Sequence, residues 1–461
     1  MNSIKNNSFL GTEPLGKLLF KLAIPTISAQ LINLLYNVVD RIYIGHMDEI
    51  GDLALTGVGV CMPLIMIISA FAALVSSGGA PRASIFMGKG DKESAERTMG
   101  ACFALQCIIS VILTVVMMVF HRPLLLAFGA SENTIKYAAD YMRVYSLGTI
   151  FVQLTLGMNA YITAQGFAKM GMLTVVIGAV ANIALDPLFI FVFNMGVRGA
   201  ALATVISQAI SCVWVIIFLL GKQSILKLKK STVKLDIKLI LPCLALGLAP
   251  FIMQSSESII SVCFNSSLLE YGGDVAVGAM TVLTSVMQFA MLPLQGLAQG
   301  AQPIISYNYG ARNKNRVKGI FKLLLTCSLV YSISVWAGVM LFPRGFAAIF
   351  TSKSDLLTFT ASALRIYCAV LGIFGIQIAC QMTFVALGKA LSSMSVAVMR
   401  KFVLLLPLIY IVPTFFDSEM KATGVYLAEP IADIIAVTFT AILFAFQFKK
   451  ALRDMENISE E

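Results

Sequence analysis

Charged residues are scarce in this 461-residue chain. They make up 13% of it, whereas hydrophobic residues reach 58%. Soluble globular domains carry about 25% charged residues, so the composition excludes an ordinary soluble protein. The apolar residues form continuous runs of about 20 residues, which is the length of a membrane-spanning helix, and not the short alternating strands of a membrane barrel. The sequence therefore predicts a helical integral membrane protein.

Histidine is also scarce, and the cysteines have no ordered spacing. The chain has two His, and its nine Cys are scattered singly, with neither the spacing of a metal site nor the pairing of a disulfide framework. No Gly-rich phosphate loop follows a predicted strand. These absences exclude a zinc site, a disulfide scaffold and a phosphate-binding loop. We therefore expect that the protein is not an enzyme and holds no cofactor apart from a coupling ion.

The basic residues that give the chain its net charge of +10 are spread along its length. Most Lys and Arg lie in short loops between apolar runs, as orientation in a membrane requires, so we expect no nucleic-acid partner. The same rule places both termini in the cytoplasm. The sequence predicts twelve membrane-spanning helices, at 17–44, 53–80, 95–120, 134–163, 169–193, 199–220, 239–268, 275–301, 318–342, 356–386, 391–413 and 424–448.

The two halves of the chain repeat. At a constant offset of 222 residues, Pro81 matches Pro303 and Gly88 matches Gly310, and further pairs follow along the chain. Because each half has an even number of helices, both halves enter the membrane from the same side, as in the parallel repeats of alternating-access transporters. We predict an all-α membrane protein with two pseudo-symmetric lobes of six transmembrane helices, divided into an N-lobe (1–222), a cytoplasmic linker (223–238) and a C-lobe with a short tail (239–461).

A polar group inside the fifth predicted helix stands out from its apolar surroundings. Asn182 and Asp186 lie four residues apart, on one face of the helix, and Pro187 frees a backbone carbonyl one turn earlier. A carboxylate at a bilayer centre costs roughly 2.5–3.5 kcal/mol, so one that is kept there is a functional candidate. Asp40 on the first helix is a second such acid. The C-lobe has Val and Leu at the equivalent positions, which favours an ion site in the N-lobe.

The predicted topology places five polar side chains in one layer of the N-lobe. Asp40 and Asp186 both lie within roughly 6–11 Å of the outer face, at a rise of 1.5 Å per residue. The inward-running fourth and sixth helices bring Tyr141 and Thr204 to a similar depth. Two carboxylates, an amide, a phenol and a hydroxyl suit either a proton or an oxygen cage for Na⁺. We therefore predict that Asp40, Asn182, Asp186, Tyr141 and Thr204 form the ion-coupling site, with Asp40, Asn182, Asp186 and Thr204 as the ligands of Na⁺.

A second group of residues could line a substrate cavity. Glu257 on the seventh helix is predicted to face a cavity, because a charge that faces lipid is costly. Asp433, near Glu429 on the twelfth helix, could face a cavity or pack against polar groups of a neighbour. The remaining cavity candidates are Tyr36, Gln254, Met287 and Met291, and for the methionines ordinary helix packing is the alternative.

The whole chain, from about residue 15 to 448, resembles the multidrug and toxic compound extrusion (MATE) antiporters, in the bacterial MepA-like branch. The resemblance rests on three stretches, which are Ala23-Ile24-Pro25 through Asp40, Asn182-x-x-x-Asp186-Pro187, and Gln302 to Ala311. It implies two six-helix lobes in a V that open outward and inward in turn. It also implies that the acids of helices one and five bind the coupling ion. Asn159 resembles a further family position, but its predicted depth places it near the cytoplasmic face.

These observations lead to one expected function. We predict a secondary active antiporter in the bacterial plasma membrane that exports lipophilic organic cations in exchange for H⁺ or Na⁺, acting as a monomer within the lipid bilayer. The alternative on the same scaffold is a flippase for lipid-linked oligosaccharides. That role favours a cavity rich in Arg and Lys, whereas the intramembrane charges of this sequence are chiefly acidic.

Overall fold

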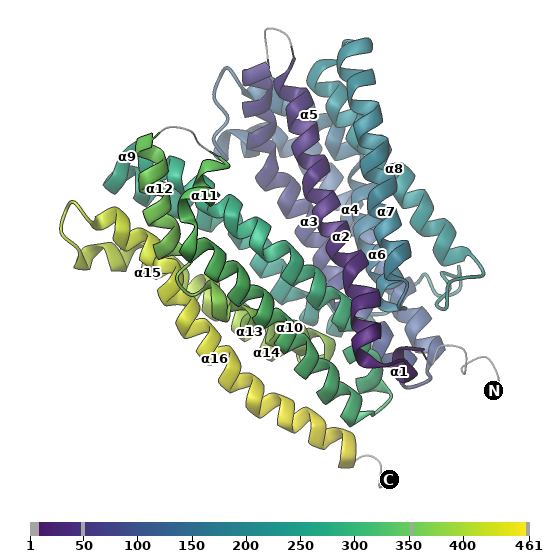
Figure 1. Ribbon diagram of the computed structural model, residues 1–461. Coiled ribbons are helices and arrows are strands. Elements are labelled where there is room, and N and C mark those ends of the chain that lie inside the picture. The colour runs from purple at the N-terminus through teal and green to yellow at the C-terminus, as the bar shows by residue number, and fades with distance from the viewer. Residues whose placement is uncertain (1–8, 48–50, 351–353, 458–461) are drawn as a thin grey trace.

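The computed structural model describes residues 9–47, 51–350 and 354–457, and these form an almost entirely helical protein (Figure 1). The first eight residues and the end of the predicted tail lie outside this range. Within the described part, nine helices are long and apolar enough to cross a membrane, and two bent helix pairs raise the number to eleven. One of the nine, α9, is a hairpin of two spans, so the prediction of twelve membrane-spanning helices is confirmed.

The first six spans form the N-lobe. The fourth span is bent by 58° between α5 and α6, and the fifth continues from α7 into a π-helical turn, η2. The elements are α1 (Phe9–Thr12), α2 (Leu15–Gly45), α3 (Gly51–Gly88), α4 (Lys92–Ala127), α5 (Ile135–Leu147), α6 (Thr149–Ala164), α7 (Ala168–Pro187), η2 (Leu188–Val192) and α8 (Gly196–Leu220).

The C-lobe repeats this order. Its fourth span is bent by 43° and its fifth contains a π-helical turn, η4. The elements are α9 (Ile237–Gly310), α10 (Lys314–Leu341), α11 (Pro343–Ala348), α12 (Ser354–Tyr367), η3 (Leu371–Ile373), α13 (Phe374–Ala386), α14 (Ala390–Val398), η4 (Met399–Leu405), α15 (Leu406–Ile411), η5 (Val412–Phe415) and α16 (Lys421–Asn457).

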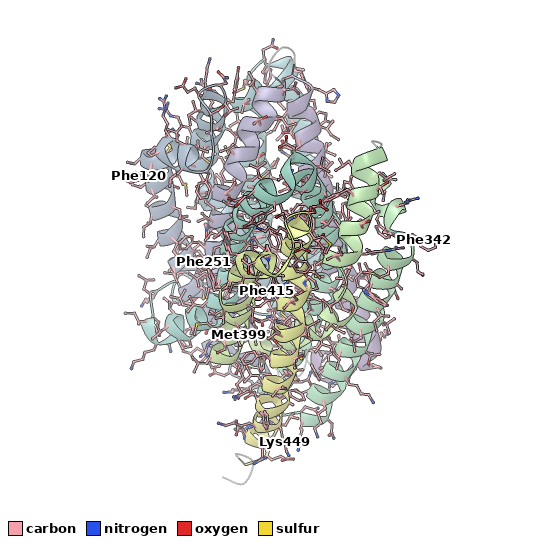
Figure 2. The ribbon with its side chains drawn as sticks, turned by 90° about the vertical axis from the view of Figure 1, so that its left-hand side faces the viewer. Phe120, Phe251, Phe342, Met399, Phe415 and Lys449 are labelled. Carbon is pink, nitrogen blue, oxygen red and sulfur yellow. The ribbon has the colours of Figure 1, made fainter. Side chains whose placement is uncertain are left out.

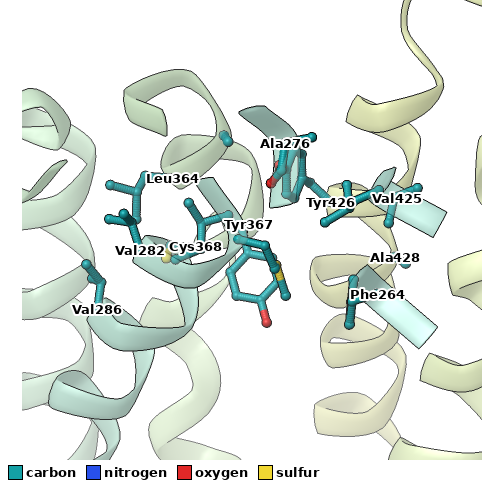
Figure 3. Close-up of a cluster of buried hydrophobic side chains, with 14 of the residues drawn as sticks. Phe264, Ala276, Val282, Val286, Leu364, Tyr367, Cys368, Val425, Tyr426 and Ala428 are labelled. Carbon is teal, nitrogen blue, oxygen red and sulfur yellow. The ribbon is translucent and has the colours of Figure 1, made fainter. Parts of the chain in front are cut away.

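Gly273 divides α9 into the seventh and eighth spans. Its φ of 62° and ψ of −160° are not helical, and glycine adopts this conformation without a Cβ clash. The two arms then fold back on each other, because Phe264 before the break and Leu283 after it belong to one buried apolar cluster. Figure 3 shows this cluster, which also includes Tyr367 and Cys368 of the tenth span.

The two lobes cross closely at one end of the molecule, where α1 and the last turns of α16 lie (Figure 1). We call this the terminal end. At the crossing, Gly88 of α3 packs on the backbone of Tyr307, and Gly310 of α9 packs on the backbone of Ile85. Gly88 and Gly310 are equivalent in the predicted repeat, so the contact follows the pseudo-symmetry. A Cβ at either position would lie 2.0 Å from a carbonyl oxygen of the other lobe.

The hydrogen bonds between the lobes lie in the half of the molecule near the terminal end. Thr26 Oγ1 donates to the carbonyl of Gly296 at 2.6 Å, and Gln30 Nε2 donates to Gln299 at 3.1 Å. In the described residues, no hydrogen bond links the lobes beyond the level of Gln30 on α2. The lobes diverge from there to the opposite end, as the arms of a V do (Figure 1).

The flanks of the molecule are covered by exposed apolar side chains. Phe120 and Phe342 lie at opposite edges of the molecule in Figure 2 and are 52% and 68% exposed, and Phe415 is 80% exposed. In water, apolar surface on this scale would drive association, whereas in a bilayer the lipid tails cover it. The protein is therefore a multi-pass membrane protein.

Two helices are longer than the apolar runs predict. The second span is expected at 53–80 and the eighth at 275–301, but α3 continues to Gly88 and α9 to Gly310. These extra turns are more polar, and they are stabilised by packing between the lobes at the terminal end. Hydropathy alone cannot detect helix that is buried in protein instead of lipid. The lobe boundaries at residues 222 and 239 remain a prediction.

Candidate functional site

The predicted ion site assembles where α2 packs against α7. The side chains of Asp40 on α2 and Asp186 on α7 are buried, with 7% and 0% of their surface exposed. Their carboxyl groups lie close enough to interact electrostatically with each other. In the described residues, neither carboxyl group forms an ion pair. The N-lobe therefore holds two adjacent buried acids with no basic side chain paired to them.

Asn182 completes the centre of the site. It lies one turn before Asp186, and its Nδ2 donates to Asp186 Oδ1 at 3.1 Å. Three buried oxygens then remain without a hydrogen-bond partner in the described part of the chain, namely Asp40 Oδ1, Asn182 Oδ1 and Asp186 Oδ2. Buried polar atoms are almost always satisfied in folded proteins. Three orphaned acceptors in one place are therefore a candidate binding site for a proton or a small cation.

Two further predicted residues lie beside the acids. The phenol of Tyr141 on α5 lies near the side chain of Thr204 on α8, and it interacts electrostatically with Asp40. Thr204 Oγ1 itself donates to the carbonyl of Ala200 at 3.0 Å. Tyr36, one turn before Asp40 on α2, interacts with both aspartates. Four helices thus bring these polar groups together, and their role in ion coupling stays a prediction.

The local backbone at Asp186 follows from the proline after it. Pro187 has no N–H, so the carbonyl one turn earlier loses its helical partner. The helix then widens into the π-helical turn η2, in which the N–H of Phe193 bonds to the carbonyl of Leu188. Such π-helical turns occur frequently at functional sites.

A small cavity extends the site into the N-lobe. It has a volume of about 70 Å³ and reaches from Tyr36, Asn182 and Thr204 to Asn159 on α6. Amide and hydroxyl groups line it, and the side-chain oxygens of Asn159 and Gln208 have no partner in the described residues. Polar cavities of this size hold water. Asn159 is expected near the cytoplasmic face, yet it lines the same cavity as Asn182.

The sequence analysis did not identify several residues of this cavity. They include Ser207, Gln208 and Ser211 of α8, which share one face of that helix with the predicted Thr204, at steps of three or four positions. That spacing within an apolar helix was a usable signal. Thr155 and Thr174 contribute from α6 and α7.

The predicted cavity residues of the C-lobe do not join the N-lobe site. Glu257 on α9 is partly exposed, and its carboxylate accepts a bond from Lys401 Nζ at 2.6 Å. Met287 and Met291 pack against the apolar core of the C-lobe, where the sulfur of Met287 contacts Cys368. This placement favours ordinary packing for the methionines. Gln254 lies one turn before Glu257, half-buried.

The sequence did not reveal the buried basic residues of the C-lobe, although the acids Glu257, Glu429 and Asp433 still outnumber them there. Arg400 and Lys401 lie inside the eleventh span, and they are only 6% and 3% exposed. Arg400 donates to Glu429 at 2.9 Å and to Asp433 at 2.8 Å. The basic pair is tolerated because carboxylates from other helices compensate it, which the sequence of one span cannot reveal. Asp433 and Glu429 therefore pack against polar groups of a neighbouring helix.

Comparisons with known proteins identify the family. The model of the MatE family matches residues 25–188 and again residues 249–411, one match in each lobe. The multidrug export protein MepA of Staphylococcus haemolyticus is 23% identical over 421 residues, which cover 91% of this chain and 92% of that protein. MepA of Staphylococcus aureus (strain MSSA476) is 21% identical over 430 residues, covering 93% and 94%.

Solved structures agree with these relatives. A crystal structure of MATE in the bent conformation superposes with a TM-score of 0.91 at 24% identity, covering 98% of this chain and 99% of that one. The MATE multidrug transporter DinF-BH, solved as a complex, gives a TM-score of 0.88 at 34% identity, covering 96% and 98%. The two matches of the family model span more than half of the sequence. This chain therefore belongs to the MatE family, the family of multidrug and toxic compound extrusion transporters.

Proposed function

We propose that the protein is a secondary active antiporter that exports lipophilic organic cations in exchange for H⁺ or Na⁺. Asp40, Asn182 and Asp186 bind the coupling ion, and Tyr141 and Thr204 support them. The observation that carries this proposal is the set of three orphaned oxygens on the facing side chains of α2 and α7. These oxygens leave the site incomplete until a proton or a cation occupies it.

The ion and the cationic substrate compete for the same negative charge, and this competition couples their binding. Two adjacent carboxylates repel each other in a medium of low dielectric constant, and a single added positive charge removes much of that repulsion. When the site is loaded with H⁺ or Na⁺, the lobe no longer attracts a cationic substrate, which then leaves. When the ion has been released, the negative charge favours binding of the next cation. A coupling free energy of about 1–3 kcal/mol between the two ligands is sufficient for this exchange.

The multidrug character of the substrate is carried over from relatives. MepA is named as a multidrug export protein, and DinF-BH is named as a multidrug transporter. The exposed carboxylate of Glu257 and the phenol of Tyr36 are proposed to contact the cargo, together with Gln254. The proposed orientation in the bacterial plasma membrane places the terminal end in the cytoplasm, because the Lys- and Arg-rich loops gather there. We propose a monomer.

The buried Arg and Lys side chains of the C-lobe do not support the flippase alternative. Recognition of a pyrophosphate group needs Arg or Lys side chains that are available to it. Arg400 is engaged by Glu429 and Asp433, and Lys401 is engaged by Glu257. No observation favours this second function, so we do not pursue it.

Efflux of ethidium from cells tests the proposal. Asp40→Asn and Asp186→Asn keep the side-chain size but remove the charge, so both variants should lose efflux while membrane expression is unchanged. The matched control is Asp91→Asn, an exposed aspartate in the same lobe, and it should export like the wild type. Full efflux by both site variants, at equal expression, would refute the role of these acids.

A further inference from the structure

The C-lobe contains a cluster of five charged side chains that the proposed ion site does not use. Arg400 lies between Glu429 and Asp433 of α16, and its guanidinium also stacks 4.7 Å from the ring of Phe374. Lys401 reaches the other way, to Glu257 on α9. Both basic residues belong to η4, and the wide turn of a π-helix rotates neighbouring residues less than an α-helix does. Adjacent Arg and Lys side chains can therefore both enter the lobe.

The charges of the cluster do not balance. Three carboxylates, on Glu257, Glu429 and Asp433, face two cations, on Arg400 and Lys401, so one negative charge is uncompensated. Four of the five side chains are almost fully buried, whereas the side chain of Glu257 is 54% exposed. The surplus negative charge thus meets solvent-accessible space at Glu257. With all five side chains ionised, one further positive charge that binds there makes the cluster neutral.

The cluster occupies the place of the N-lobe cavity in the repeat. At the offset of 222, Gly178 and Ala179 of that cavity correspond to Arg400 and Lys401. For the last helix of each lobe the offset is 225, as the match of Gly199 with Gly424 shows, so Thr204 and Gln208 correspond to Glu429 and Asp433. These four positions are small or neutral in one lobe and charged in the other. The C-lobe therefore replaces a polar cavity with resident ion pairs.

We propose that Lys401 is an internal counter-cation that occupies Glu257 in the empty transporter and is displaced from it by a cationic cargo. Glu257 is then a cargo subsite for lipophilic organic cations, and Lys401 sets its affinity by competing for the same carboxylate. This inference rests on the proposed function in one respect, namely that the cargo carries a positive charge.

A second carboxylate is available to Lys401 when it is displaced from Glu257. Lys401 also interacts electrostatically with Glu429, which shares Arg400 with Asp433. Glu429 and Asp433 carry two negative charges and Arg400 carries one positive charge, so one negative charge remains for a second cation. The ammonium group can therefore turn from Glu257 to Glu429 without becoming an isolated buried charge. This matters because an unpaired buried charge is strongly destabilising. The ammonium group thus switches between two carboxylates, and the cargo decides which one it pairs with.

The test measures binding of tetraphenylphosphonium to the full-length protein in lipid nanodiscs. Lys401→Met removes the competitor, so the cation should bind about 5-fold or more tightly, the lower end of usual coupling between sites. Glu257→Gln should weaken binding, and adding Lys401→Met to it should change nothing further. Lys401→Arg keeps a competing charge and should bind like the wild type. Lys421→Met, which removes a lysine elsewhere in the C-lobe, controls for loss of charge alone.

Glu429→Gln gives an independent readout if Lys401→Met does not fold. It removes the second partner of Lys401, so Lys401 should stay on Glu257 and tetraphenylphosphonium should bind more weakly. Unchanged or weaker binding by a folded Lys401→Met variant would overturn the inference, as would unchanged binding by Glu429→Gln. If the wild type binds no tetraphenylphosphonium, both the inference and the cation cargo of the proposed function fail. If the wild type binds it and only these variants disagree, the proposed function stands.

Discussion

The glycine crossing at the terminal end predicts how one methyl group shifts the balance between conformations. A Cβ at Gly88 would lie 2.0 Å from the carbonyl oxygen of Tyr307, and a Cβ at Gly310 would lie 2.0 Å from that of Ile85. Real Cβ atoms essentially never come within 3.0 Å of another heavy atom, and backbone atoms cannot swing aside. Gly88→Ala or Gly310→Ala must therefore push α3 and α9 apart by about 1 Å, and overpacking of this kind costs about 1–3 kcal/mol.

The added methyl group raises the free energy of the conformation in which the terminal end is closed. A conformation that is open at the terminal end does not contain the crossing, so its relative population should rise about 5- to 150-fold, the factor that corresponds to this free energy. Pulsed electron paramagnetic resonance can measure the shift, with spin labels at Lys89→Cys and Lys318→Cys in a background without the native cysteines. Both alanine variants should add a longer-distance population.

Gly59→Ala is the matched control for this experiment. Gly59 lies in the same helix, α3, but a Cβ there meets nothing within 4 Å. Its distance distribution should equal that of the wild type. If Gly88→Ala and Gly310→Ala also keep the wild-type distribution and melting temperature, the close crossing does not hold the terminal end shut, and this reasoning is refuted.

Two further predictions concern stability. Asp91 caps α4 by accepting a bond from the N–H of Ser94 at 2.9 Å, and the side chain and N–H of Ser94 together lower the pKa of the Asp91 carboxyl. Asp91→Ala should lower the free energy of unfolding by about 1 kcal/mol, measured as a reduced melting temperature in detergent, while Asp91→Asn, which retains a capping oxygen, should not. Arg400→Met should destabilise the protein by about 3–5 kcal/mol, because it leaves Glu429 and Asp433 buried without their cation. If Arg400→Met melted within about 1 °C of the wild type, the buried ion pairs would not contribute to stability in this way.

The sequence was sufficient to predict the lobes because their signals are local. Apolar runs mark the spans, and the constant offset of Pro81 to Pro303 and Gly88 to Gly310 marks the repeat. The helix ends were less predictable. The last turns of α3 and α9 are stabilised by contact with each other, and such a contact between distant segments has no signature in either segment alone.

The difference between signals within one segment and contacts between distant segments also explains which site residues the sequence revealed. Asp40 and Asp186 are isolated acids in apolar helices, so each one is conspicuous before its partner is known. Lys401 was missed because its partner, Glu257, lies 144 positions away along the chain. Asn159 lies near the end of α6, where it donates a hydrogen bond to the carbonyl of Gly171 near the start of α7, and it reaches the cavity of Asn182 because that cavity runs along the lobe and not within one layer.

Transport by the reconstituted protein under an imposed gradient tests the central claim most directly. The wild type or Asp186→Asn would be reconstituted into proteoliposomes, and accumulation of tetraphenylphosphonium would be followed after a pH or Na⁺ gradient is applied. The account predicts that one of the two gradients drives accumulation by the wild type and that neither drives it through Asp186→Asn. Equal gradient-driven accumulation by both proteins would contradict the account.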